Sequence, residues 1–247
     1  MTLFQRIHYI WVRVGLALLV LMPLAAYVTF RPWGVAADVL QTHGGVAVTI
    51  GSEAIVFAPA APRSSGLLLL PGCPVDPVAY APLARRVAEQ GHLAMIVKIP
   101  YRCASLPNLE AQLDRRVHAL AATSPTTRWV LAGHSRGAAH AARLTDARPN
   151  NLAAYVLIGT SHPRDHDLSR LAIDVTKVAA TNDGVAGPAQ FETARLPAST
   201  HWVRIEGGNH AQFGYYGYQL FDGRATITRD AQQAATLAAL LAVLSRY

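Results

Sequence analysis

Charged residues are scarce in this chain of 247 residues, and they form no cluster. Asp, Glu, Lys and Arg make up 15% of the sequence, whereas 51% is hydrophobic, a balance that excludes an intrinsically disordered protein. The formal net charge is +7, but no Lys/Arg block and no aromatic-rich RNA-binding pattern accompanies it, so we expect no nucleic-acid partner. The sequence also lacks internal repeats and low-complexity tracts. Its length is compatible with one large domain, with or without a membrane segment.

Charge is absent altogether from a stretch near the N-terminus. Residues 14–30 contain no charged side chain and lie between Arg13 and Arg31. A helix of this length, at about 1.5 Å per residue, just crosses a hydrocarbon core. We therefore interpret residues 1–31 as a membrane anchor. The alternatives are a signal peptide cleaved near the small residues 35–37, and a buried helix of the soluble domain.

The charges around this segment predict its orientation. Arg6 and Arg13 precede it, whereas Arg31 follows it with Asp38 beyond. Positive residues favour the cytoplasmic side, so the N-terminus is expected in the cytoplasm and the rest of the chain outside. A cleaved signal would instead give a secreted or periplasmic protein. The net positive charge suits a protein that lies near an anionic membrane.

The chain after the anchor is expected to form a tether, residues 32–44, and one domain, residues 45–247. The domain begins with a predicted hairpin and then alternates apolar runs with segments of helical period. This pattern is typical of an α/β fold with a mostly parallel sheet and helices on both faces. The predicted strands are residues 46–50, 54–59, 66–72, 93–100, 128–133, 152–160, 175–181 and 201–207, and the predicted helices are residues 77–90, 108–123, 135–147 and 230–247.

The pentapeptide GHSRG, residues 133–137, matches G-x-S-x-G between a predicted strand and a predicted helix. A strand that becomes a helix within about one residue strains Ser135, and side chains at Gly133 or Gly137 would collide with nearby backbone. The turn would hold Ser135 above the sheet edge, where the amino end of the helix favours developing negative charge. A simple helix cap is the alternative. The flanking strand and helix favour a nucleophile.

A serine hydroxyl is a weak nucleophile, so it needs a base and an acid that orients the base. His210 follows the last predicted strand just after Gly207 and Gly208, at the edge of the sheet where catalytic groups belong, and it is the predicted base. Other histidines are less suitable. His134 adjoins Ser135 on a turn that points it elsewhere, and His162 and His166 follow an earlier strand. His201 begins a strand at the wrong end of the sheet.

The predicted acid is Asp183, which follows the predicted strand 175–181 and gives the chain order Ser, Asp, His. Its neighbours Asn182 and Gly184 are also plain turn residues, so a structural role is the alternative. Asp165 and Asp167, one strand earlier, are competing candidates. The backbone N–H groups of Arg136 and Cys73 are the predicted oxyanion donors. No metal or cofactor is implied.

Four segments together resemble the α/β-hydrolase superfamily, and within it the α/β-hydrolase fold-5 group related to the dienelactone hydrolase-like proteins: PGCPVDPVAYAPLARRVAEQG, GHSRG, TNDGVA and EGGNHAQFGYYGYQLFDGRATITRDAQQ. The resemblance runs from about residue 45 to the C-terminus and implies that Ser135, Asp183 and His210 are nucleophile, acid and base. Dienelactone hydrolases usually carry Cys at the nucleophile, so Ser135 favours general ester cleavage through an acyl-enzyme. A non-catalytic membrane-tethered binding protein, or a peptidase, acyltransferase or thioesterase with this triad, is the alternative.

The resemblance bears on the cysteines and on the substrate pocket. The family commonly has two Gly where this chain has Gly72 and Cys73. In the family the strands that precede Cys73 and Cys103 are neighbours, which is compatible with a disulfide between the two residues, and export of the domain would permit it. Two separate thiols are the alternative. Residues 161–174 are too few for a helical cap, so we expect an open site for a small ester. Gly72 and the aromatic residues Phe213, Tyr215 and Tyr216 are expected to bind substrate. The alternative is that the aromatic side chains only hold their loop against the core.

Overall fold

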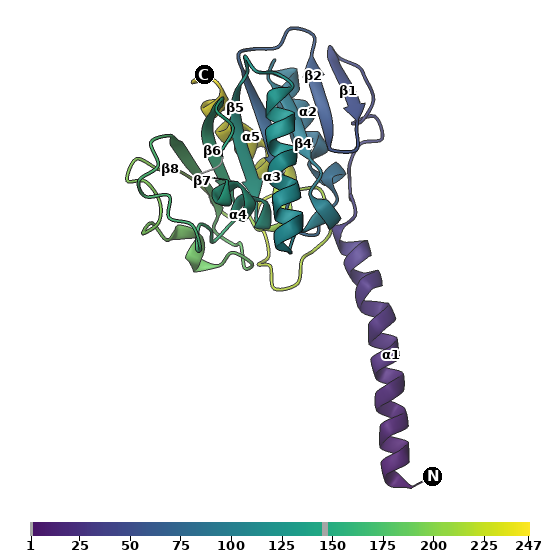
Figure 1. Ribbon diagram of the computed structural model, residues 1–247. Helices are drawn as coiled ribbons and strands as arrows, with labels where there is room; N and C mark the ends of the chain where they lie inside the picture. The colour runs from purple at the N-terminus through teal and green to yellow at the C-terminus, as the bar shows by residue number, and fades with distance from the viewer. Residues whose placement is uncertain (1, 145–147) are drawn as a thin grey trace.

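The computed structural model describes residues 2–144 and 148–247, and its centre is a sheet of eight strands (Figure 1). The strand order is β1-β2-β4-β3-β5-β6-β7-β8. β1 and β2 form an antiparallel hairpin that pairs antiparallel with β4, and every other pairing is parallel. The strands are Val46–Ile50 (β1), Ala54–Pro59 (β2), Ser65–Leu70 (β3), Leu93–Val97 (β4), Arg128–His134 (β5), Leu152–Ile158 (β6), Asp174–Ala180 (β7) and His201–Ile205 (β8).

Helices cover both faces of the sheet, which confirms the predicted fold class. One face carries α2 (Ala81–Glu89) and α5 (Arg229–Leu244), and the other carries α3 (Pro107–Ala122) and α4 (Arg136–Arg143). β3 explains the unbroken apolar runs, because its successive side chains alternate between the two buried clusters. The helix expected over residues 135–147 is observed as α4, and residues 145–147 of that prediction lie outside the described residues.

The N-terminal segment forms one helix, α1 (Leu3–Phe30), which projects away from the sheet and its covering helices (Figure 1). None of its residues is buried, so the interpretation as a buried helix of the soluble domain is wrong. Its length and composition are sufficient for a membrane span or a signal sequence. At about 1.5 Å per residue the helix is roughly 42 Å long.

The segment that follows α1, residues 32–44, is bound to the surface of the fold. Val39 is buried in the core cluster on the α2 side of the sheet. Arg85 of α2 donates hydrogen bonds to the backbone carbonyls of Val39, Gln41 and His43. The segment that the sequence predicts as a tether therefore runs along α2 and fixes where α1 leaves the domain.

The parallel strands bring distant loops to one edge of the sheet. The carboxyl ends of β3, β5, β6, β7 and β8 share a direction, so the residues that follow them meet. α1 ends at the same edge, because the carbonyl of Phe30 accepts a hydrogen bond from the N–H of Asp76, just beyond β3. The hairpin turn between β1 and β2 also lies there, since Ala54 pairs with Val97 at the carboxyl end of β4.

Candidate active site

Ser135 occupies a strained turn between β5 and α4. Its φ of 53° lies in the left-handed region, which non-glycine residues rarely adopt. A Cβ on Gly133 would collide with the backbone of Gly137, and a Cβ on Gly137 would collide with the carbonyls of Leu70 and Pro71. The two glycines therefore allow α4 to begin directly against the end of β3. This close approach presents the Ser135 side chain at the edge of the sheet.

Asp183 lies directly behind the imidazole of His210. Asp183 Oδ2 is 2.9 Å from His210 Nδ1, and both side chains are almost completely buried. The other carboxylate oxygen, Oδ1, accepts hydrogen bonds from the N–H groups of Val185 (2.9 Å) and Ala186 (2.7 Å), which fixes the orientation of the carboxylate. With the Nδ1 proton donated to Asp183, His210 Nε2 is left as an acceptor. Within the described residues Nε2 has no hydrogen-bond partner.

The competing carboxylates are placed differently. Asp165 and Asp167 are exposed in the loop between β6 and β7. Asp167 accepts a hydrogen bond from the N–H of Ser169, 2.9 Å away, which lowers the pKa of this carboxyl group. Asp183, which the order of residues favours, is thus the carboxylate that the structure brings to His210.

Ser135 and His210 line one cavity of about 190 Å³. The lining also includes Arg136 and Arg164, two exposed cationic side chains, and the apolar Val185. The loop between β6 and β7 contributes to the wall and contains no helix, as the sequence predicts. The cavity thus combines a nucleophilic hydroxyl, an imidazole acceptor and positive charge.

The loop after β3 contains two adjacent backbone donors that differ in their partners. Gly72 N–H donates to Tyr80 Oη at 2.9 Å and is therefore engaged, whereas Cys73 N–H has no acceptor among the described residues. Arg136 N–H belongs to the first residue of α4, where a helix supplies no acceptor. The contact of Gly137 with Leu70 and Pro71 brings these two chain segments together. Cys73 and Arg136 are thus available to hold an oxyanion, but Gly72 is not.

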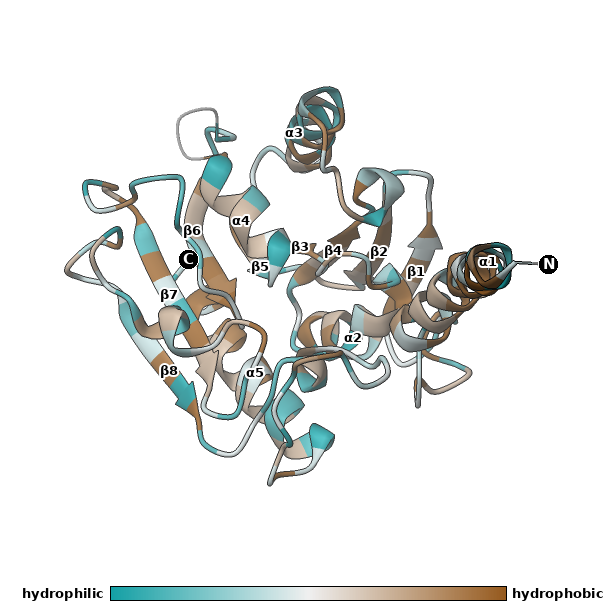
Figure 2. Cartoon of the chain, turned by 90° about the horizontal axis from the view of Figure 1, so that it is seen from below, coloured by the Kyte–Doolittle hydropathy of each residue, from teal (hydrophilic) through white to brown (hydrophobic). Residues whose placement is uncertain are grey.

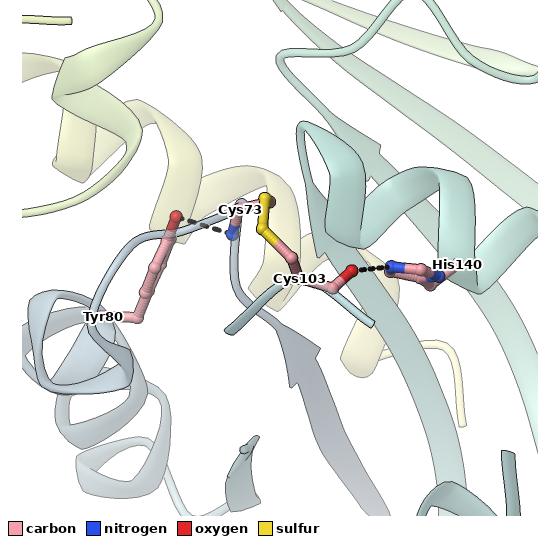
Figure 3. The surroundings of a disulfide bond; sticks show 5 residues. Cys73, Tyr80, Cys103 and His140 are labelled. Carbon is pink, nitrogen blue, oxygen red and sulfur yellow. Dashed lines mark hydrogen bonds between the residues drawn. A yellow bond between two sulfur atoms is a disulfide. The ribbon is translucent and has the colours of Figure 1, made fainter. Parts of the chain in front are cut away.

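A disulfide between Cys73 and Cys103 connects the loops after β3 and β4 (Figure 3). The two Cα atoms are 4.7 Å apart. His140 of α4 donates from Nε2 to the carbonyl of Cys103 at 2.9 Å, and burial lowers the pKa of this histidine. The alternative of two separate thiols is therefore wrong. The disulfide holds the candidate donor Cys73 between its own loop and α4.

The aromatic residues after His210 support its loop and do not line the cavity at Ser135, which corrects the expectation that they bind substrate. Phe213 and Tyr216 are fully buried: Phe213 packs on the ring of His134, and Tyr216 Oη donates to the carbonyl of His210 at 3.5 Å. The N–H of Tyr215 donates to the carbonyl of Ala79. Their packing against the fold turns these residues away from a substrate at Ser135.

Asp222 is a buried carboxylate that the sequence did not indicate. Its oxygens accept hydrogen bonds from the N–H groups of His210 (3.0 Å), Ala211 (2.8 Å) and Gly184 (3.3 Å). Burial raises its pKa, although these three donors oppose the rise. Asp222 thus ties the loop of the base to the turn of Asp183. Nothing in its local sequence suggests this role, because its partners are remote along the chain.

The ring of His134 lies against the ring of His210, the candidate base. The sequence instead led us to expect that His134 points elsewhere. The centroids of the His134 and His210 rings are 4.5 Å apart. Tyr80 Oη, which accepts from Gly72, lies 2.7 Å from His134 Nδ1 and donates to it. Burial, followed by the nearby His210, lowers the pKa of His134 well below its ordinary value. A neutral His134 adds no positive charge that would make His210 a weaker base.

Lys177 of β7 is a buried lysine beneath the loop that follows β6. Its Nζ donates to the carbonyls of Thr160 (2.6 Å) and His162 (2.8 Å), two residues that line the cavity. Burial lowers the pKa of Lys177 to about 7, an effect that Asp183 and Glu192 partly oppose. Lys177 therefore fixes the wall of the cavity by bonding its backbone.

We expect Lys177 to make folding stability depend on pH. The unfolded chain keeps this proton up to the ordinary pKa of 10.5, whereas the folded chain releases it near 7, so stability rises with pH between these values. Relative to the Lys177→Met variant, the free energy of unfolding should rise by about 1 kcal/mol between pH 7 and pH 8. Chemical denaturation of both chains in the same detergent checks this. A difference that stays constant from pH 6 to pH 9 would contradict it.

A family model described as "Alpha/beta hydrolase family" matches residues 66–234, which include Ser135, Asp183 and His210. Comparison with curated proteins gives no match. The matched region extends from the beginning of β3 into α5 and so contains most of the parallel sheet. It covers more than half of the chain, enough to settle the family.

Solved structures with this fold include proteins of several descriptions. A dienelactone hydrolase from Anabaena variabilis has a TM-score of 0.60 at 16% identity, over 81% of this chain and 99% of its own. A carboxylesterase from Mesorhizobium loti has a TM-score of 0.54 at 18% identity, over 79% and 99%. A membrane phospholipase A, described as a bacterial virulence factor, has a TM-score of 0.59 at 13% identity, over 98% and 99%. At these identities the likeness concerns the fold alone.

Proposed function

The chain belongs to the α/β-hydrolase family, and from this we propose that it is a serine hydrolase that cleaves a carboxylic ester with Ser135, His210 and Asp183. The observation that carries the proposal is the position of His210. Its Nδ1 lies 2.9 Å from the buried carboxylate of Asp183, and its ring lines the same cavity as Ser135. A base that is oriented by an acid and shares a cavity with a hydroxyl has the parts needed to activate serine.

The proposed reaction is acyl transfer to water. His210 Nε2 accepts the proton of Ser135 Oγ as the oxygen attacks the ester carbonyl, and the N–H groups of Cys73 and Arg136 bind the oxyanion. The alcohol leaves with the proton from His210. Water, deprotonated by the same imidazole, then attacks the acyl-enzyme; the acyl–Oγ bond breaks, the acid leaves, and His210 returns the proton to Ser135 Oγ. Asp183 keeps the proton on Nδ1 throughout and stabilises the imidazolium.

We also propose that α1 is retained as a membrane anchor, with the hydrolase domain on the extracytoplasmic side. The end of α1 is built into the fold: Thr29 and Phe30 accept hydrogen bonds from Gly217 and Asp76, and the ring of Phe30 packs against Tyr216. Cleavage of a signal peptide would remove these contacts from the loop that carries His210. The bonds therefore favour an uncleaved helix over the secreted form.

An active-site fluorophosphonate probe tests the nucleophile. We expect the full-length chain to be labelled at Ser135 and the Ser135→Ala variant to remain unlabelled. Ser161 lines the same cavity, so Ser161→Ala is the matched control and should keep full labelling. Mass spectrometry of the labelled peptide identifies the residue. Absence of label in the parent chain, or its loss with Ser161→Ala alone, would favour a non-catalytic protein or a different nucleophile.

A further inference from the structure

Two exposed aromatic residues sit on strained backbone at the edge of the sheet that carries the candidate site. Tyr101 has a φ of 49° with 87% of its surface exposed, and Phe221 has a φ of 69° with 79% exposed. The left-handed region is unfavourable for side chains with a Cβ, and a large exposed ring returns no packing energy to the fold. The packing of neither side chain within the fold therefore offsets the conformational energy of its strained backbone. This combination indicates that the rings bind something outside the domain.

The two aromatics flank the candidate site from opposite sides. Tyr101 precedes by two residues Cys103, which is joined by a disulfide to the candidate oxyanion donor Cys73. Phe221 directly precedes Asp222, whose carboxylate holds the loop of His210. Whatever contacts the two rings therefore lies over the machinery between them.

Further exposed apolar side chains belong to the same loops. We call the set the apolar rim; it consists of Tyr101, Leu106, Tyr218, Leu220 and Phe221, each between 58% and 87% exposed. All five follow the carboxyl ends of β4 and β8. An apolar set of this kind on a surface marks a site of contact with a protein or a membrane.

The position of α1 indicates that the apolar rim contacts a membrane and not another protein. It leaves the fold at the edge of the rim, since Thr29 accepts a hydrogen bond from Gly217, immediately before Tyr218. Trp33 N–H donates to the carbonyl of Tyr215, which fixes the exit on its other side. Figure 2 shows α1 nearly end-on beside the loops of this edge. A membrane spanned by α1 therefore faces the rim.

A second cavity at this edge suits a hydrocarbon chain. It has a volume of about 420 Å³, and its wall combines the apolar Ile50 and Ile99 and the rim residue Tyr101 with three charged residues: Asp76, Lys98 and Arg102. Pro71 and Val75 contribute from the loop that contains Cys73. A cavity with apolar walls on one side, beside the loop that contains Cys73, provides a place for an acyl chain.

We propose that the apolar rim docks on the bilayer spanned by α1, so that the cavity at Ser135 opens onto the membrane, and that the substrate is an ester of a membrane lipid. The substrate class rests on the proposed hydrolase function, whereas the docking does not. Without Arg6 and Arg13, which precede the span, the chain keeps 20 basic and 15 acidic residues, and this net charge of +5 adds attraction to an anionic leaflet. A lipid then reaches Ser135 from the membrane surface.

The docking is tested without any turnover. The described part of the chain has no free cysteine, so the Phe221→Cys variant can carry a single environment-sensitive NBD label. With the full-length chain in vesicles of phosphatidylcholine and phosphatidylglycerol, we expect blue-shifted, brighter emission from this label. Thr126 is exposed in the loop before β5, at the opposite edge of the sheet, so Thr126→Cys is the control and should report water. Equal emission at the two positions would overturn the docking.

The substrate class is tested in the same vesicles with a double substitution in the rim. Leu220→Ser with Phe221→Ser, two rim residues that line neither cavity, should lower fatty-acid release from vesicle lipid by about 100-fold or more, because each side chain that no longer enters the apolar phase costs about 10 to 100-fold. Hydrolysis of soluble p-nitrophenyl acetate should stay unchanged. Leu220→Ile with Phe221→Leu keeps the rim apolar and should behave like the parent chain.

The failures of the two proposals differ. If the parent chain cleaves p-nitrophenyl acetate but not vesicle lipid, or if the Ser variant loses both activities equally, the lipid substrate is wrong. If neither substrate is cleaved, the hydrolase function itself fails, and the label at position 221 still decides whether the rim docks.

Discussion

The Asp183→Asn variant should lose about 10⁴-fold in kcat while it remains folded. The substituted side chain is nearly isosteric, and its amide oxygen could still accept from the N–H groups of Val185 and Ala186. The amide nitrogen, however, would face His210 Nδ1 as a donor and stabilise the tautomer whose proton is on Nε2. That tautomer cannot accept the proton of Ser135. The loss therefore appears in kcat, measured by steady-state kinetics on a soluble ester.

The competing carboxylates provide matched controls for this substitution. Asp165→Asn and Asp167→Asn change an exposed loop residue in the same way and should leave kcat within a few-fold of the parent value. Circular dichroism of all three variants shows whether the fold is kept. A large loss with Asp165→Asn or Asp167→Asn, together with a small loss for Asp183→Asn, would assign the acid to the loop after β6.

The turn that carries Ser135 could be predicted because its signals are local. Gly133, Ser135 and Gly137 lie within five residues, and the flanking apolar run and helical period are visible in the same segment. The order of strands and helices was predictable for the same reason, since buried parallel strands are continuous apolar runs. The structure adds the cause of the spacing: α4 begins so close to β3 that only glycine fits at position 137.

The support of the base could not be predicted, because it depends on contacts between distant segments. Asp222 bonds to the backbone of His210 and Gly184, and backbone groups leave no signature in the sequence. Lys177 resembles an ordinary charged residue within a strand until its burial is known. The prediction of a pocket wall from the aromatic residues after His210 is wrong for a related reason. An aromatic cluster in a loop is equally compatible with a wall and with an anchor, and only the packed structure distinguishes the two.

The position of the candidate oxyanion donor follows partly from the sequence and partly from the structure. The sequence places Cys73 after β3 and Cys103 after β4, but only the pairing of β3 with β4 makes the two residues neighbours. The structure also gives a physical reason to prefer Cys73 over its neighbour: the Gly72 N–H donates to Tyr80, whereas the Cys73 N–H has no acceptor among the described residues. The disulfide, Tyr80 and His140 together position this one amide.

The Gly137→Ala variant should be strongly destabilised, because the added Cβ would meet backbone that cannot rotate away. It would lie well within 3.0 Å of the carbonyl oxygens of Leu70 and Pro71, at the end of the central strand β3. Relief requires α4 to move away from β3, which costs about 3 kcal/mol. The same movement displaces Ser135 and Arg136 N–H from the loop of Cys73, so kcat should also fall by about 100-fold.

A second glycine separates this effect from the general cost of a methyl group. A Cβ on Gly51, in the turn between β1 and β2, would meet only the carbonyl of Ala54 at 3.5 Å, an ordinary contact distance. Gly51→Ala should therefore keep both the stability and the activity of the parent chain, as measured by thermal unfolding and ester hydrolysis. If Gly137→Ala unfolds at the same temperature as Gly51→Ala and retains activity, α4 does not begin against β3 as described. The Ser135 turn would then need another explanation.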